Sequence, residues 1–279
     1  MKLGVLYICP TPIGNLEDIT IRTLRILEEV DLIAAEDTRH TIKLLNHYEI
    51  KKPLISYHEH NKKAKGHILI EKLKLGTNIG LVTDAGMPGI SDPGEDIIHL
   101  AIENGIKVIC LPGPTASITG LVISGLPTDK FVFEGFLPSK KKDRIEELKR
   151  LKDEYRTIIL YESPHRLINL LKDLNQVLGN RKVSISRELT KLHEETFRGT
   201  IEEALNKFHN EVPRGEFVLI LDGAESVKID LYKNITLEEH IKLYIDDGLT
   251  RKDAVKKVAE IRNIPRNLVY KASINKNSK

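Results

Sequence analysis

The chain has 279 residues, of which 41% are hydrophobic and 30% are charged, and its formal net charge at pH 7 is +3. This composition is typical of a globular protein with room for two domains, and no apolar stretch approaches the roughly 18 residues of a membrane span. The two cysteines, Cys9 and Cys110, are predicted to be buried thiols, and two alone form neither a disulfide framework nor a zinc site.

The first part of the chain alternates short apolar runs with amphipathic segments. The first run follows Met1-Lys2 directly, so we expect no signal peptide and a cytoplasmic location. Strands are predicted over 4–9, 31–36, 54–58, 78–83 and 107–111, with helices near 20–29, 38–47, 62–75 and 93–104. This order predicts an α/β domain over residues 1–117, built on a doubly wound parallel sheet. Asp92 is the predicted cap of the fourth helix, with Pro93 at its first position.

A helix near 115–124 leads into a second predicted α/β domain, residues 118–224. Strands are predicted over 131–136, 157–162, 182–188, 195–200 and 216–222, with helices near 141–152, 164–178 and 201–209. Phe197 is the one apolar residue in Glu194 to Thr200, which predicts a partly exposed antiparallel strand and therefore a mixed sheet. Ser163-Pro164 predicts the start of a helix.

A polar linker near 224–235 precedes a small helical module, residues 236–279. Its helix signals are the capping boxes Thr236-x-x-Glu239 and Thr250-x-x-Asp253, the apolar stripe of Ala254, Val258 and Ile261, and the helix-opening Pro265. Short helices joined by tight turns are typical of a helix-turn-helix. The alternative is a helical extension that packs on the body or on a second subunit.

The positive charge of the chain is concentrated near its C-terminus. Residues 249–279 hold nine Lys or Arg against Asp253 and Glu260, a net +7, which leaves −4 for residues 1–248. A basic tail on a mildly acidic body predicts an anionic macromolecular partner, most simply nucleic acid. A solvated helix face that keeps the protein soluble explains the charge equally well.

Three glycine- and proline-rich loops follow predicted strands of the first domain. They are Thr11-Pro12-Ile13-Gly14-Asn15, Asp84 to Gly94, and Pro112-Gly113-Pro114-Thr115-Ala116-Ser117. Loops at the carboxyl ends of parallel strands line the crevice where open α/β sheets bind ligands. Glycine lets the backbone approach a ligand closely, and proline fixes the loop shape. The sequence therefore predicts a small-molecule site built mostly from backbone.

Charged residues cluster where the second predicted strand ends, in Ala34-Ala35-Glu36-Asp37-Thr38-Arg39-His40. Helix capping by Asp37 or Thr38 explains part of this cluster but not all of it. The usual motifs for NAD, P-loop phosphate, zinc-protease and α/β-hydrolase chemistry are absent from the sequence. The pair His58 and His60 stands alone, which favours a polar loop, and no metal site is expected.

The three loops in this order resemble the tetrapyrrole methylase family of S-adenosylmethionine-dependent methyltransferases. Further motifs strengthen the resemblance: Ala35-Glu36-Asp37-Thr38-Arg39, Leu126-Pro127-Thr128-Asp129, Glu134-Gly135-Phe136-Leu137-Pro138 and Tyr161-Glu162-Ser163-Pro164-His165-Arg166. The resemblance covers nearly the whole chain. It implies two α/β domains with S-adenosylmethionine folded in the cleft between them, followed by a helix-turn-helix-like extension.

Positions that match the family's motifs are expected to contact the cofactor. They are Pro12, Asp84, Ala85, Pro88, Gly89, Ile90, Thr115, Ala116, Glu162, Leu189, Gly215 and Glu216. Thr83-Asp84-Ala85 stands where the family has Gly-Asp-Pro, and the loop behind it is longer.

The matching motifs resemble those of the branch of the family that acts on the small ribosomal subunit, which implies 2′-O-methylation of a cytidine ribose in 16S rRNA. We also expect a homodimer. Methyl transfer from a sulfonium is an in-line displacement, so the protein must hold the hydroxyl in line and receive its proton. Glu36 and Asp37 are the candidate bases and Arg39 the candidate cation. The alternatives are a tetrapyrrole or protein methyltransferase of the same fold, and a non-enzymatic RNA-binding or ribosome assembly protein.

Overall fold

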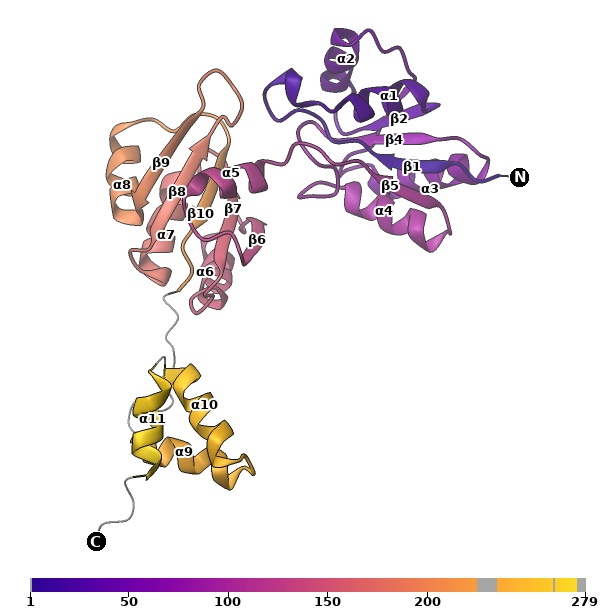
Figure 1. Ribbon diagram of the computed structural model, residues 1–279. Helices are drawn as coiled ribbons and strands as arrows, with labels where there is room; N and C mark the ends of the chain where they lie inside the picture. The colour runs from indigo at the N-terminus through magenta and orange to yellow at the C-terminus, as the bar shows by residue number, and fades with distance from the viewer. Residues whose placement is uncertain (1, 225–234, 263, 275–279) are drawn as a thin grey trace. The chain divides into compact units, whose positions relative to one another are not determined.

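The computed structural model describes residues 2–224, 235–262 and 264–274 (Figure 1). The chain divides into two compact units, Met1–Ala224 and Glu225–Lys279. The first unit contains two five-stranded sheets, and the described part of the second consists of three helices. No helix among the described residues is long and apolar enough to cross a membrane.

The first sheet has the strand order β3-β2-β4-β1-β5, and every pair in it is parallel. Its strands are β1 (Val5–Ile8), β2 (Leu32–Ala35), β3 (Leu54–Ser56), β4 (Ile79–Val82) and β5 (Lys107–Cys110). The helices between them are η1 (Leu16–Asp18), α1 (Ile21–Glu29), α2 (Thr38–His47), α3 (Lys62–Lys74) and α4 (Gly94–Glu103). The predicted doubly wound parallel sheet is confirmed.

Helices cover both faces of this sheet, which is why its central strands are apolar throughout. One core cluster joins the sheet to α1 and α2 through Leu27 and Leu44, and another joins it to α3 and α4 through Leu69 and Ile97. All four residues of β4 are buried. Because the sheet is packed on both faces, its strands are held in place, and so are the starting points of the loops that follow their carboxyl ends.

The second sheet has the order β6-β7-β10-β8-β9 and is mixed, since only β6 and β7 pair in parallel. Its strands are β6 (Phe131–Phe136), β7 (Thr157–Glu162), β8 (Lys182–Arg187), β9 (Glu195–Thr200) and β10 (Phe217–Leu221). The helices are α5 (Ala116–Ser124), α6 (Lys141–Arg150), α7 (Leu167–Leu178) and α8 (Ile201–Asn210). The prediction of a mixed sheet with 195–200 as an antiparallel strand is confirmed, and β9 lies at the sheet edge.

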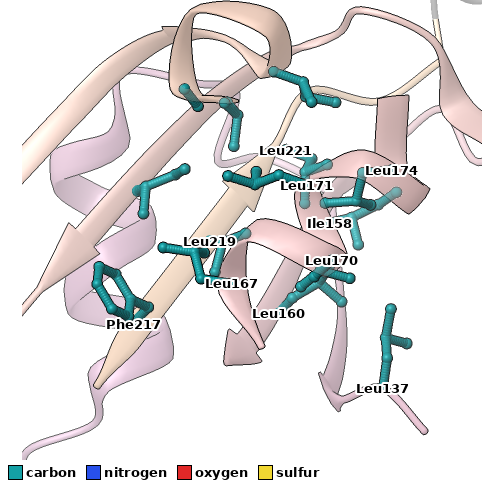
Figure 2. Packing of buried hydrophobic residues seen from close by; sticks show 14 of the residues in the cluster. Leu137, Ile158, Leu160, Leu167, Leu170, Leu171, Leu174, Phe217, Leu219 and Leu221 are labelled. Carbon is teal, nitrogen blue, oxygen red and sulfur yellow. The ribbon is translucent and has the colours of Figure 1, made fainter. Parts of the chain in front are cut away.

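The core of this second half lies between β7, β8, β10 and the helices α6, α7 and α8. Figure 2 shows Leu170, Leu171 and Leu174 of α7 beside side chains of β7 and β10, among them Leu160 and Leu219. The opposite face of the sheet packs against Leu121 of α5. Because α5 directly follows the third loop, its packing on the second sheet places the end of that loop beside this sheet.

The structure corrects two local predictions, one in each half of the first unit. The helix predicted from 164 begins at Leu167, because the hydroxyl of Ser163 pairs with Glu162 instead of capping the helix, and residues 164–166 form a turn. Cys110 is exposed, because β5 is an edge strand, whereas Cys9 is buried. Burial raises the pKa of Cys9 to about 12, so that thiol stays protonated.

The three-helix module of the second unit has its own core. It comprises α9 (Leu237–Asp246), α10 (Arg251–Arg262) and α11 (Arg266–Ile274). The predicted capping box of Thr236 and Glu239 is present, and Pro265 precedes the third helix as predicted. Ile261 is exposed, contrary to prediction, since Ala254, Val255, Val258 and Ala259 form the buried face of α10.

Candidate functional site

Loops from β1 and β4 are bound to each other at the carboxyl edge of the first sheet. The amide of Thr11 donates to the carbonyl of Gly86 at 2.9 Å, and the amide of Gly86 donates back at 3.0 Å. The hydroxyl of Thr11 also donates to the carbonyl of Thr83 at 3.0 Å. The first two predicted loops therefore form one rigid wall.

Asp92 shapes the second loop. Its carboxylate accepts hydrogen bonds from the amides of Gly89 at 2.9 Å, Ile90 at 3.2 Å and Gly94 at 2.7 Å. The predicted cap was wrong: α4 begins at Gly94, so Pro93 occupies the N-cap position, and Asp92 instead orders the loop that precedes the helix. Gly94 has to be glycine, because a Cβ there would lie 2.7 Å from the nitrogen of Gly89. Burial raises the pKa of Asp92, while the amide bonds act in the opposite direction.

A cavity of about 520 Å³ opens beside this wall and is lined by both halves of the first unit. The first half contributes the second loop and the residues that follow β2 and β4. The second half contributes the carboxyl ends of β6 and β7, the start of β10, and Glu188, Leu189 and Lys191. Carboxylates dominate the charged lining: Glu36, Asp84, Asp92, Glu162, Glu188 and Glu216, against the single cation Lys191 among the described residues. Such a lining favours a ligand with positive charge.

Glu36 and Asp84 face this cavity from neighbouring strands, at the ends of β2 and β4. Oε2 of Glu36 accepts a hydrogen bond from the hydroxyl of Thr83 at 2.6 Å and another from the amide of Asp84 at 3.4 Å. Oδ1 of Asp84 accepts from the amide of Asp37 at 3.1 Å. Burial, and after it the nearby Glu36, raise the pKa of Asp84 above its ordinary value.

Asp37 and Arg39 lie outside the cavity lining and are paired with each other. Asp37 caps α2, accepting from the amide of Arg39 at 2.8 Å, and its other oxygen accepts from Nη2 of Arg39 at 2.7 Å. The guanidinium of Arg39 holds the pKa of Asp37 well below its usual range. The side chain of Arg39 is 88% exposed. Of the three candidate catalytic residues, the structure therefore places Glu36 alone on the cavity.

Glu162 presents an unsatisfied oxygen at the end of β7. The residue is only 1% exposed; its Oε1 accepts from the amide of Ser163 at 2.8 Å and lies 3.1 Å from Nε of Arg166. Oε2 is buried and has no hydrogen-bond partner among the described residues. Burial raises the pKa of this carboxyl. A buried orphan acceptor on a cavity wall fits a ligand that donates a hydrogen bond there.

Most of the residues expected to contact a cofactor line this cavity. Those that do are Asp84, Ala85, Ile90, Thr115, Ala116, Glu162, Leu189 and Glu216. Pro12, Pro88, Gly89 and Gly215 do not line it. Gly89 and Gly215 have φ of +89° and +81°, so they shape the adjoining loops. A Cβ on Gly215 would collide with the side chain of Glu188.

Several lining residues lie outside the set that was expected to contact the cofactor. Phe136 and Tyr161 form an aromatic wall, and the hydroxyl of Tyr161 accepts a hydrogen bond from the amide of Ser117 at 3.0 Å. Glu188 and Lys191 pair at 3.1 Å on the loop after β8. In the sequence, the charged residues of Arg187-Glu188-Leu189-Thr190-Lys191 are the signal for this pair, whereas the motifs around 136 and 161 carry only the family resemblance.

Comparison with known proteins agrees with this architecture. Residues 5–205 match the model of the family described as Tetrapyrrole (Corrin/Porphyrin) Methylases. The chain is 48% identical over 274 residues to the "Ribosomal RNA small subunit methyltransferase I" of Bacillus subtilis (strain 168), covering 97% of this chain and 94% of that protein. A protein of the same name from Thermotoga maritima is 50% identical over 223 residues, which are 80% of this chain and 100% of that protein.

Among solved structures, the uroporphyrin-III-C-methyltransferase from Thermus thermophilus superposes with a TM-score of 0.57 at 18% identity. The match covers 82% of this chain and 98% of that one. At this identity the likeness establishes the fold alone.

Proposed function

This chain belongs to the tetrapyrrole (corrin/porphyrin) methylase family, and we propose that it transfers a methyl group from S-adenosylmethionine to the 2′-hydroxyl of a cytidine ribose in 16S rRNA. The observation that carries the substrate class is the sequence similarity to proteins named as small-subunit rRNA methyltransferases, which are 48% identical over 97% of this chain and 50% identical over 80% of it. The cavity supports the chemistry, because its lining fits the methyl donor and includes a carboxylate that can accept a proton.

The cavity fits S-adenosylmethionine in size and charge. Its volume of about 520 Å³ lies within the roughly 300–1,000 Å³ usual for small-molecule sites. The donor carries a sulfonium and an ammonium group, both cationic, and the wall carries carboxylates such as Asp84 and Glu216. The orphan Oε2 of Glu162 can accept a hydrogen bond from an ammonium, amino or hydroxyl group of the donor.

The bound donor supplies an electrophilic methyl group, so the protein's task is to position the hydroxyl and accept its proton. Both hydrogen bonds to Glu36 end on Oε2, and no described residue donates to its Oε1. Thr83 and the amide of Asp84 thus fix the carboxylate while Oε1 remains available as a base. Asp37 is a poorer base, because Arg39 depresses its pKa.

Asp84 tests the assignment of the donor site. In Asp84→Asn the amide oxygen can still accept the hydrogen bond of Asp37, so the loop is retained while the negative charge is lost. We expect weaker binding of S-adenosylmethionine, by about 5- to 150-fold for the loss of a charged interaction worth about 1–3 kcal/mol. Isothermal titration calorimetry measures this affinity, with thermal unfolding as the control for folding.

The same titration run against pH sharpens the test. Because the pKa of Asp84 is raised, its charge is lost at a higher pH than in an ordinary aspartate as the solution is acidified. The affinity of the native protein for the donor should therefore decrease at a higher pH than it would with an aspartate of ordinary pKa. In Asp84→Asn this pH-dependent decrease should be absent. Equal affinity in both proteins at every pH would remove Asp84 from the donor site.

We assign RNA capture to the helical module. Its exposed cations among the described residues are Lys242, Arg251, Lys252, Lys256, Lys257, Arg266 and Lys271. Arg262 has a structural role instead, since it donates to Nδ1 of His240 and to the carbonyl of Ile235. Lys276 and Lys279 lie outside the described residues. Exposed cations on one small unit are suited to neutralising phosphates.

Deletion of residues 236–279 should therefore spare donor binding and weaken RNA binding. Fewer phosphate contacts release fewer counterions, so the dependence of RNA affinity on salt should also become shallower. Fluorescence anisotropy with a small-subunit RNA fragment over a salt series measures both changes. Calorimetry with S-adenosylmethionine is the control, because the cavity belongs entirely to the first unit. Undiminished RNA affinity and salt slope in the truncated protein would refute the assignment.

We further propose that the protein is a homodimer and acts in the cytoplasm. Ile118 and Val122, one helical turn apart on α5, are 44% and 69% exposed. Exposed apolar side chains at i and i+4 make a stripe that a second copy can cover. The mass of the full chain in solution, from light scattering or sedimentation, decides between monomer and dimer.

A further inference from the structure

A β-bulge near the end of β6 changes which way its last side chain points. In the pairing with β7, Phe133 lies opposite Ile159 while Gly135 lies opposite Leu160, so Glu134 is an extra residue. In a regular strand, Phe133 and Phe136 would point to opposite faces. The bulge brings both rings to the same side.

The bulge depends on glycine and touches the first half of the unit. Gly135 has φ of +60°, a left-handed conformation, and a Cβ there would lie 3.0 Å from Oγ of Ser91 in the second loop. The next residue, Phe136, consequently lies at the lining of the cavity beside that loop.

Tyr161 holds the two phenylalanine rings in place. The ring centroid of Tyr161 is 5.1 Å from that of Phe133 and 5.5 Å from that of Phe136, at interplanar angles of 73° and 59°. The tyrosine hydroxyl is itself bound to the amide of Ser117. The cluster is therefore preorganised on one edge, which leaves the other side of Phe136 for a ligand.

Phe136 is more exposed than structural packing requires. Of the described aromatic residues that line the cavity, Phe217 is 2% exposed and Tyr161 is half-buried, whereas Phe136 is 55% exposed. Because Phe136 lines a cavity of ligand size, its exposed ring is available to contact a ligand. The flat face of such a ring is suited to a planar, unstacked heterocycle.

We propose that Phe136 is the platform on which the base of the target nucleotide stacks, so that its ribose hydroxyl enters the cavity toward Glu36. This inference rests on the proposed RNA substrate and makes Phe136 a positioning residue for the acceptor. The exposed rim position favours the acceptor base over the donor's adenine, because the donor must lie deeper for the methyl group to face the hydroxyl. Stacking accepts any base, so Phe136 contributes affinity and orientation but no sequence recognition.

Three variants test the platform. Phe136→Leu removes the aromatic face and retains apolar bulk, and Phe136→Tyr retains the face. The matched control is Phe131→Leu, because Phe131 belongs to the same strand, is 40% exposed and does not line the cavity. We expect Phe136→Leu to raise the KM for RNA by about 5- to 150-fold, with unchanged donor affinity, while Phe136→Tyr and Phe131→Leu resemble the native protein.

An abasic target identifies which base is stacked. RNA that retains the target ribose but lacks its base should bind the native protein and Phe136→Leu with the same reduced affinity. The loss of affinity from removing the base and the loss from removing the ring should therefore not add. Additive losses would show that Phe136 contacts another group and would overturn the inference. So would a Phe136→Leu variant that loses affinity for S-adenosylmethionine instead, because the ring would then hold the donor.

Equilibrium binding of the same RNAs, measured by fluorescence anisotropy with the donor present, separates this inference from the proposed function. If the native protein binds the RNA without methylating it, the proposed function is refuted. The affinities of intact and abasic RNA for native protein and Phe136→Leu would still test the stacking role of Phe136. If the native protein methylates the RNA and Phe136→Leu binds and methylates it equally well, the stacking role of Phe136 is refuted and the proposed function stands.

Discussion

RNA in which only the target cytidine is replaced by its 2′-deoxy form is expected to accept no methyl group. The proposed acceptor is the ribose hydroxyl, so its removal leaves no nucleophile at the position that the cavity wall orients. Binding should survive, because most of the affinity of an RNA-binding protein comes from phosphates and from neighbouring nucleotides. Transfer of labelled methyl groups and anisotropy, measured on the same RNA, separate the two effects.

The matched control for this experiment is RNA with a single deoxy substitution at the neighbouring nucleotide. It should be methylated at nearly the native rate, because its acceptor is intact. Methylation of the deoxy target at the native rate would place the methyl group on a base atom, which contradicts 2′-O-methylation.

Glu36→Gln is expected to lower the single-turnover rate of methyl transfer by about 100-fold or more, the range typical of a lost general base. Glutamine preserves the shape and the hydrogen bond from Thr83 but cannot take up the proton of the ribose hydroxyl. Binding of both RNA and donor should remain, so the loss should appear in the chemical step.

Asp37→Asn provides the matched control, because the neighbouring carboxylate caps α2 outside the cavity lining. Asparagine is also a good helix cap, so this variant should fold and transfer the methyl group at nearly the native rate. Arg39→Ala should likewise spare the chemical step, since that side chain is paired with Asp37 and largely exposed. Small effects at Glu36 as well would mean that positioning alone drives the transfer.

The fold could be predicted from the sequence because local patterns determine it. Runs such as Ile79–Val82 and Phe217–Leu221 are apolar throughout, as buried strands must be. The loop from Asp84 to Gly94 was predicted as part of the site on its glycines and prolines, and the structure places most of its residues on the cavity.

The parts of the site that were missed depend on long-range pairing. The bulge that turns Phe136 toward the cavity arises from the register of β6 on β7. Gly135 permits the bulge, but a single glycine in a strand does not show where the next side chain points. Similarly, the cluster from Glu36 to Arg39 reads as one charged group in the sequence. In the structure Glu36 alone lines the cavity, because the side chain of Asp37 caps α2 and forms an ion pair with Arg39 outside it.

The central claim is that this protein methylates a cytidine ribose of small-subunit rRNA, and labelled methyl transfer from S-adenosylmethionine followed by mass mapping of that RNA tests it most directly. We predict label on a single cytidine and resistance of the adjoining phosphodiester to alkali, because methylation of the 2′-hydroxyl removes the internal nucleophile of alkaline cleavage. The predicted signal should also be absent from rRNA of cells that lack the protein. Label on a base atom, on protein or on a tetrapyrrole, with none on the ribose of small-subunit rRNA, would contradict the claim.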